Sequence, residues 1–176
     1  MSEHVFIAIP CGKSLLDVDQ SVSLTDTIVS FVEAGLKRPE RRILHGNCYV
    51  HYCRAMLTHQ FFWETDCTHL FFWDDDVSSP PGALLRLMAH DRDFTVAPYP
   101  KKLPPGTPPQ EAWPYAVTTG IPDERGLLEC DMAATGFMLI KREVIASLYE
   151  KHADRVFYDP KTDAEVVDLF PTGLIP

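Results

Sequence analysis

Leu70-Phe71-Phe72-Trp73-Asp74-Asp75-Asp76 is the stretch that decides the fold of this chain, because four large apolar residues run straight into three aspartates. A short apolar run rich in aromatic residues is typical of a strand buried on both faces. Open α/β sheets bind their ligands at the carboxyl ends of the strands, which is where these carboxylates would lie. Since side chains alternate along a strand, we expect Asp74 and Asp76 to point to one side, about 6–7 Å apart in Cα, and Asp75 to point away.

This spacing predicts a site for a divalent cation. Two hard oxygen donors could share one ion, and the ion would relieve the repulsion among three adjacent carboxylates. A solvated acidic turn is the alternative, since the chain has 25 Asp and Glu against 16 Lys and Arg. The apolar run before the aspartates and the helix start predicted at residues 78–81 favour the metal site.

Composition limits the class of protein. With 176 residues, 45% of them hydrophobic, we expect a single domain over residues 1–176. The net charge of −9 argues against a general nucleic-acid binder. No apolar run is long enough for a membrane span, and residues 1–4 lack the basic start of a signal peptide. Five cysteines without a Cys-x-x-Cys pair suggest reduced thiols, so we expect a cytoplasmic location.

Strand and helix patterns alternate along the chain. We predict strands at 5–9, 42–44, 70–73, 94–97, 127–131 and 137–140, and a last apolar patch at 166–170. Helices are expected from a capping box at Ser23 to Gly35, over 49–64, from Ser79 to Met88, and over 142–152. This order predicts an α/β fold, a Rossmann-like, mostly parallel mixed sheet with helices on both faces.

Two further segments have ambiguous patterns. Seven prolines between Pro98 and Pro114 predict an irregular loop, either functional or a plain surface excursion. His45, Cys48, His51 and Cys53 are metal-ligand types, but they fall within nine residues and lack the distant second pair of a structural zinc site. We interpret them as part of a helix face.

Several separated segments coincide with one family. An early strand ends in a small turn, and Arg54 lies on the helix before the aspartate strand. Residues 68–77 (THLFFWDDDV), 97–102 (APYPKK) and 135–142 (TGFMLIKR) follow. In order and spacing these pieces resemble the GT-A-fold glycosyltransferases, most closely bacterial and viral members, which use nucleotide-sugar donors and carry an Asp-x-Asp metal motif. The resemblance covers residues 5–145.

The resemblance implies a donor site. Asp76 would be the main protein ligand of Mn²⁺ or Mg²⁺, and Asp74 would contact the metal or the ribose. Arg54 would lie near the donor phosphates, its alternative being a solvated helix arginine. We count Asp75 among the donor-binding candidates as a member of the same motif. Backbone at Pro10, Cys11 and Gly12 would contact the base or ribose of a UDP- or GDP-sugar.

The acceptor side is less complete. The resemblance implies that Tyr99 and Lys101 line the sugar or acceptor side and that Gly136 helps to form the acceptor wall. GT-A enzymes commonly place an acidic residue after the segment matching 136–142, about where this sequence ends. Either the chain is C-terminally truncated or Glu129 or Asp131 takes the catalytic part.

These observations lead to one main hypothesis and two alternatives. The main one is a metal-dependent glycosyltransferase of hexosyltransferase type that moves a sugar to a saccharide or other hydroxyl acceptor. The first alternative is a nucleotidyltransferase-like enzyme, for which Cys11-Gly12-Lys13-Ser14 is a poor phosphate loop. The second is a catalytically idle nucleotide-sugar-binding domain of the same fold. The donor sugar, the stereochemical course and the oligomeric state are not predicted.

Overall fold

The computed structural model describes residues 3–13, 15–47, 49–100, 117–118 and 121–172. Lys101 and most of the proline-rich segment predicted to form a loop lie outside these ranges. In the described part, no helix is long and apolar enough to cross a membrane.

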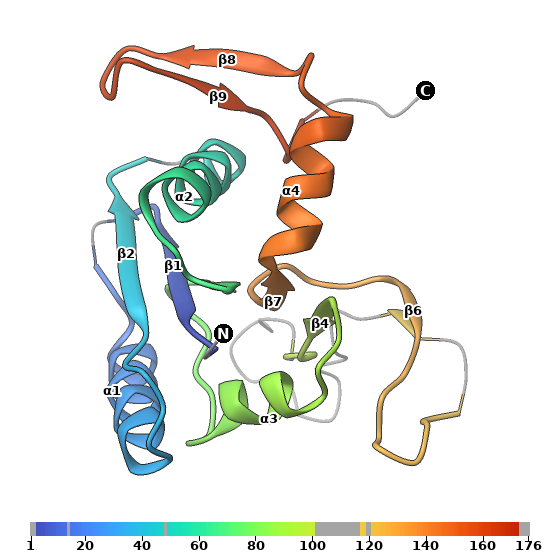
Figure 1. The fold of residues 1–176 in the computed structure, drawn as a ribbon. Coiled ribbons are helices and arrows are strands. Elements are labelled where there is room, and N and C mark those ends of the chain that lie inside the picture. Colours follow the sequence, from blue (N-terminus) through green and yellow to red (C-terminus); the bar gives the residue numbers. More distant parts are fainter. Residues whose placement is uncertain (1–2, 14, 48, 101–116, 119–120, 173–176) are drawn as a thin grey trace, which may run out of the picture.

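A sheet of five strands forms the centre of the molecule (Figure 1). Its order is β2 (Glu40–His45), β1 (Val5–Cys11), β3 (His69–Trp73), β7 (Phe137–Lys141) and β4 (Phe94–Val96). β1 pairs in parallel with β2 and β3, whereas β7 is antiparallel to β3 and β4. The predicted mixed, mostly parallel sheet is therefore confirmed.

Helices cover both faces of this sheet, as predicted. α1 (Val18–Glu33) and α3 (Ala83–Ala89) pack on the face that carries alternate strand residues such as Ile7 and Phe71. α2 (Val50–Glu64) and α4 (Arg142–Lys151) pack on the opposite face, against residues such as Phe72. All residues of β1 and β3 are buried, which explains why β1 and residues 70–73 of β3 are continuous apolar runs in the sequence.

Two helix starts were predicted wrongly. α1 begins at Val18, where the Asp17 side chain caps Asp19 N–H, so Ser23 lies inside the helix and donates its hydroxyl proton to the Asp19 carbonyl. α3 begins at Ala83, after Gly82 in the left-handed region with φ of 73°, so Ser79 does not cap it. Helical periodicity shows where a helix lies but not at which residue it begins, because several Ser and Asp residues are candidates for the N-cap.

Two small antiparallel pairs lie outside the main sheet. β5 (Val117–Thr118) pairs with β6 (Cys130–Met132), so the strand predicted at 127–131 is shorter and does not join the central sheet. β8 (Val156–Asp159) and β9 (Ala164–Val167) form a hairpin over α2, where Val166 is fully buried against Ala55 and Met56. The apolar patch at 166–170 overlaps β9, whereas no strand was predicted for β8, although its Val-Phe-Tyr run was an available signal.

We expect Tyr52→Phe to destabilise the protein by about 1–2 kcal/mol, because a hydrogen bond to a buried carboxylate is lost. The Tyr52 hydroxyl donates to Asp159 Oδ1 at 2.7 Å and ties α2 to the hairpin. Tyr158→Phe is the matched control, since its hydroxyl bonds Asp163 on the exposed surface and its loss should change stability by less than about 0.5 kcal/mol. Urea unfolding of both variants measures the difference, and equal effects would contradict a tethering role for Tyr52.

Candidate functional site

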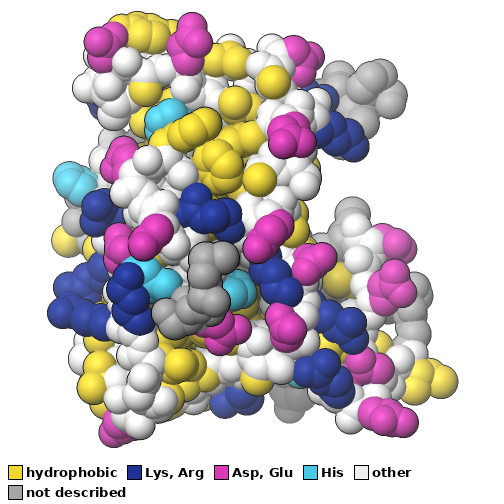
Figure 2. All heavy atoms as spheres, in the orientation of Figure 1, with side chains coloured by type: hydrophobic (Ala, Val, Ile, Leu, Met, Phe, Trp, Pro, Cys, Tyr) yellow, Lys and Arg dark blue, Asp and Glu magenta, His cyan; other side chains and the backbone are white. Residues whose placement is uncertain are grey.

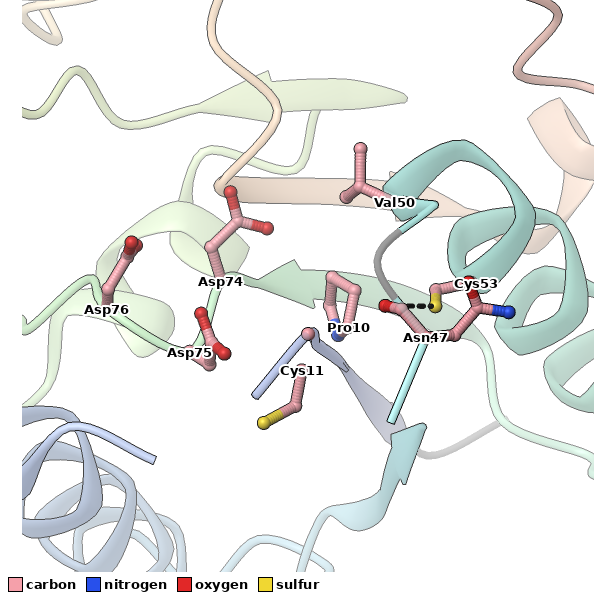
Figure 3. Close-up of a pocket in the computed structure, with 9 residues that line it drawn as sticks. Pro10, Cys11, Asn47, Val50, Cys53, Asp74, Asp75 and Asp76 are labelled. Atoms are coloured by element: carbon pink, nitrogen blue, oxygen red, sulfur yellow. Dashed lines mark hydrogen bonds between the residues drawn. The ribbon is translucent and has the colours of Figure 1, made fainter. Parts of the chain in front are cut away.

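The aspartates lie where two parallel strands end side by side. β1 ends at Cys11 and β3 at Trp73, and these strands are neighbours in the sheet. Their carboxyl ends open into a cavity of about 180 Å³, shown in Figure 3. It is lined by Pro10, Cys11, Gly12, Asn47, Val50, Cys53, Asp74, Asp75 and Asp76. The structure thus brings the predicted base-binding turn and the acidic motif into one site.

All three carboxylates face this region. Trp73 ends the strand, and Val77 N–H donates to the Asp74 carbonyl at 3.2 Å, so the motif continues as a turn. Strand alternation no longer applies there, and Asp75 lines the cavity between Asp74 and Cys11 (Figure 3). The prediction that Asp75 points away is therefore wrong. Burial and a hydrogen bond to Asp75 both raise the pKa of the Cys11 thiol.

A partly buried ion pair holds Asp74. The Arg54 Nη2 atom donates to Asp74 Oδ1 at 2.7 Å, and the side chains are 10% and 24% exposed. The guanidinium also lies 5.8 Å from the centre of the Phe72 ring. Arg54 is therefore not the solvated helix arginine that the sequence left open. Burial raises the pKa of Asp74, Arg54 opposes this rise, and the negative charges of Asp76 and Asp75 add to it.

Gly136 closes one side of the same carboxylate. Its carbonyl accepts from Asp74 N–H at 2.9 Å, and its own N–H donates to the Tyr99 hydroxyl at 3.2 Å. A Cβ atom at Gly136 would lie 2.6 Å from Asp74 Oδ2 and 2.9 Å from Tyr99 Cζ. Only a glycine permits this close approach. Burial, followed by the charge of Asp74, raises the pKa of Tyr99.

A second cavity adjoins the first. It has a volume of about 390 Å³ and shares Gly12, Asp75 and Asp76 with its neighbour. Lys13 lines it and brings a cationic side chain beside the aspartates. Sequence analysis did not predict a donor-binding role for Lys13. Its position two residues after the end of a strand could have indicated one. Asn47, Val50 and Cys53 were also missed, because their place in the site depends on β2 lying beside β1.

The two candidate catalytic residues lie elsewhere. Glu129 and Asp131 line a larger cavity of about 730 Å³ beside β4 and β7. Thr135, which precedes Gly136, lines it as well, so this cavity begins near the wall of the aspartate site. A catalytic part for Glu129 or Asp131 stays a prediction.

The aspartates fit a hard divalent cation only as an incomplete site. Asp74, Asp75 and Asp76 do not gather as three converging ligands within the described residues. The donor set is nevertheless all oxygen, and Mg²⁺ or Mn²⁺ in such sites is held by one or two carboxylates together with substrate phosphates and water. Asp74 uses Oδ1 for its bond to Arg54, which leaves Oδ2 outside that bond, and Asp76 is exposed. Both could therefore hold an ion that a bound diphosphate completes.

The His45, Cys48, His51 and Cys53 cluster noted in the sequence does not form a metal site among the residues that the structure describes. Cys48 lies outside them, and His45, His51 and Cys53 do not form a metal-ligand group. Cys53 points to the Asn47 carbonyl, with Sγ at 3.8 Å from the oxygen (Figure 3). The four described cysteines are free thiols.

Replacing Arg54 with methionine is expected to destabilise the protein by about 2–3 kcal/mol at pH 7, because the Asp74 carboxylate is left without its partner. The raised pKa means that folded Asp74 holds its proton more tightly than the unfolded chain does, so stability falls as pH rises from 3.8 through the raised pKa. Loss of Arg54 raises this pKa further and widens that window.

The penalty of Arg54→Met should therefore be smaller near pH 4 than at pH 7, as measured by urea unfolding at both values. Asp74→Asn removes the charge that needs a partner, so the double variant should be more stable at pH 7 than Arg54→Met alone. A penalty independent of pH would show that Arg54 acts through packing instead.

The fold and the site together define a Rossmann-like α/β protein with an acidic cavity at the carboxyl edge of its sheet. No family model matches the chain, and no curated protein matches it. The crystal structure of A197 from STIV is similar over 99% of this chain and 98% of its own, with a TM-score of 0.56 and 16% identity. The two proteins therefore share a fold.

A second solved structure is more distant. It is the 4-diphosphocytidyl-2C-methyl-D-erythritolsynthase from Anaerococcus prevotii DSM 20548. The match covers 90% of this chain and 80% of that enzyme, with a TM-score of 0.42 and 10% identity. A likeness at this level does not bear on the function of this chain.

Proposed function

We propose that this protein is a metal-dependent glycosyltransferase with a GT-A-like fold. Its donor would be a UDP- or GDP-sugar, and its acceptor a hydroxyl of a saccharide or related molecule. The observation that carries the proposal is the single cavity in which the turn after β1 meets Asp74, Asp75 and Asp76 after β3. This is the ligand-binding edge of an open α/β sheet, and the shared fold with A197 from STIV supports the architecture but not the activity.

The two adjoining cavities could hold the two parts of a nucleoside diphosphate. The smaller one, beside Pro10 and Asn47, would hold the nucleoside, and the adjoining one, beside Lys13, would hold phosphate. Together they fall within the size range of about 300–1,000 Å³ that is typical of small-molecule sites. Lys13 would give the phosphates a positive partner within an otherwise acidic surface.

Asp74 and Asp76 would hold Mn²⁺ or Mg²⁺ against the diphosphate. The bound ion would supply charge neutralisation for the nucleoside diphosphate as it leaves. Arg54 would contribute by favouring the ionised form of Asp74 in spite of its burial and by fixing the orientation of the carboxylate through Oδ1. In this arrangement Arg54 is a positioning residue that acts through Asp74.

The acceptor would enter from the side of Gly136. The cavity that Glu129 and Asp131 line begins there and is large enough for a saccharide. Transfer with inversion needs a carboxylate to take the proton of the acceptor hydroxyl. We assign this role to Asp131 or Glu129, and the variants Asp131→Asn and Glu129→Gln would identify which one by loss of turnover with donor binding retained.

The direct test incubates the protein with UDP-, GDP- and CMP-sugars, with Mn²⁺ or with EDTA, and with a panel of saccharide acceptors. Mn²⁺-dependent transfer of the sugar, detected by mass spectrometry, would support the proposal. Donor binding without transfer or hydrolysis on any acceptor would favour the idle binding domain instead. Release of pyrophosphate from a nucleoside triphosphate would favour a nucleotidyltransferase, and no binding of any nucleotide would overturn all three.

A further inference from the structure

A second cluster of metal-ligand side chains lies at the opposite, amino-terminal edge of the sheet. His4, Glu40 and Cys67 each offer a ligand atom, and these atoms all lie within 4.8 Å of one another. It is the one such group among the residues that the structure describes. His4 precedes β1, Glu40 begins β2, and Cys67 precedes β3, so three separate segments converge there.

One distance within this cluster matches an edge of a coordination tetrahedron. His4 Nδ1 lies 3.4 Å from Cys67 Sγ, and ligands bound to zinc at about 2.0–2.3 Å are separated by roughly 3.3–3.8 Å in tetrahedral geometry. Glu40 Oε1 lies 3.6 Å from the other ring nitrogen, Nε2. One imidazole offers one nitrogen to an ion, so the Glu40 carboxylate would have to turn toward the nitrogen that binds, within a group whose ligand atoms all lie within 4.8 Å of one another.

The histidine at the centre of the cluster is buried and incompletely satisfied. His4 is 3% exposed, Cys67 is fully buried, and His4 Nε2 has no hydrogen-bond partner. A buried polar nitrogen without a partner costs about 1–3 kcal/mol, so such atoms call for an explanation. Glu40 and the exposed Asp66, whose Oδ1 lies 3.8 Å from His4 Nδ1, surround the imidazole with negative charge.

A cationic group already occupies part of this space. Lys37 Nζ lies 2.9 Å from His4 Nδ1, and the residue is otherwise exposed. The ammonium can leave the cluster for solvent by rotation of its side chain. Figure 2 views the molecule from the side on which the chain begins, where basic, acidic and histidine side chains lie close together.

We propose that His4, Glu40 and Cys67 bind a zinc ion that displaces Lys37 and ties together the amino-terminal ends of β1, β2 and β3. A nitrogen, a sulfur and a carboxylate form a donor set that suits Zn²⁺, whereas the all-oxygen aspartate edge suits Mg²⁺ or Mn²⁺. Asp66 or water completes the coordination. The ion is structural, and this site is separate from the aspartate cavity and independent of the function proposed for it.

The test titrates ZnCl₂ into EDTA-treated, desalted protein by calorimetry and uses Co²⁺ as a spectroscopic probe. We expect one equivalent of zinc to bind and to raise the Tm, and the cobalt protein to show a thiolate-to-metal charge-transfer band. Cys67→Ser should lose that band, while Cys130→Ser, a thiol outside the cluster, keeps it. Asp76→Asn should also keep it, which separates the two edges of the sheet.

Two further variants, at the half-buried Glu40 and the exposed Lys37, test the proposal without changing a fully buried residue. Glu40→Gln should weaken zinc binding at least about tenfold. Lys37→Met should strengthen it, because no ammonium has to be displaced, and a purely structural hydrogen-bond role of Lys37 predicts no such gain. Absence of zinc binding in the wild-type protein, a cobalt band that survives Cys67→Ser, or equal affinity in Glu40→Gln would overturn the proposal.

Discussion

Asp76→Ala is expected to reduce Mn²⁺-dependent binding of the nucleotide-sugar donor by about 100-fold or more, because removal of a direct ligand exceeds the 10–100-fold effect of outer partners. Asp76 is the exposed member of the acidic motif and lines both cavities of the proposed donor site. Calorimetry with UDP- and GDP-sugars, with Mn²⁺ and with EDTA, measures the effect.

The folded state should survive this change, since surface substitutions usually alter stability by less than about 0.5 kcal/mol. Asp93→Asn is the control for net charge, because Asp93 is exposed and contacts Lys141 on another part of the surface. It should leave donor binding unchanged. Retention of Mn²⁺-dependent binding in Asp76→Ala would refute the metal role assigned to the motif.

Gly136→Ala should disable the site by steric means and destabilise the protein by about 1–3 kcal/mol. The new methyl group would overlap Tyr99 and Asp74. The backbone N–H of Gly136 donates to the Tyr99 hydroxyl, and its carbonyl accepts from Asp74 N–H. Either Asp74 or the Tyr99 ring must move, so we expect donor binding to fall at least about tenfold. Urea unfolding and calorimetry on the same preparation measure the two effects.

Gly12→Ala is the matched control for adding one methyl group to a glycine of the site. Its Cβ would meet only the Asn47 carbonyl oxygen at 3.8 Å, an ordinary contact, so the fold should tolerate it. Adding Tyr99→Ala to Gly136→Ala should restore part of the lost stability by making room. Wild-type stability and binding in Gly136→Ala would show that the close approach is not required.

Much of the fold could be predicted from local patterns. The buried runs of β1 and β3 are apolar at every position except His69, so their strands and the parallel sheet were evident. Less regular elements were not. β8 spans only four residues, Val-Phe-Tyr-Asp, too short a run to predict on its own, and its strand is held by pairing with β9 over α2.

The sequence by itself determined that a buried strand ends in three carboxylates, because an apolar run and an acidic turn are properties of adjacent residues. Only the tertiary structure decided which other residues contact these carboxylates. Arg54 reaches Asp74 across 20 residues, and Tyr99 reaches Gly136 across 37. Such contacts depend on which strands are neighbours and on the path of the chain between them, and periodicity carries no information about either.

The same reason explains why one of the two candidate sites at the sheet edges could be predicted from the sequence and the other could not. The acidic motif was visible as one continuous stretch, whereas His4, Glu40 and Cys67 are single residues spread over the first 67 positions. Only the order β2–β1–β3 brings the starts of those strands together. The aspartate site could be predicted from its local sequence, and the second cluster required the fold.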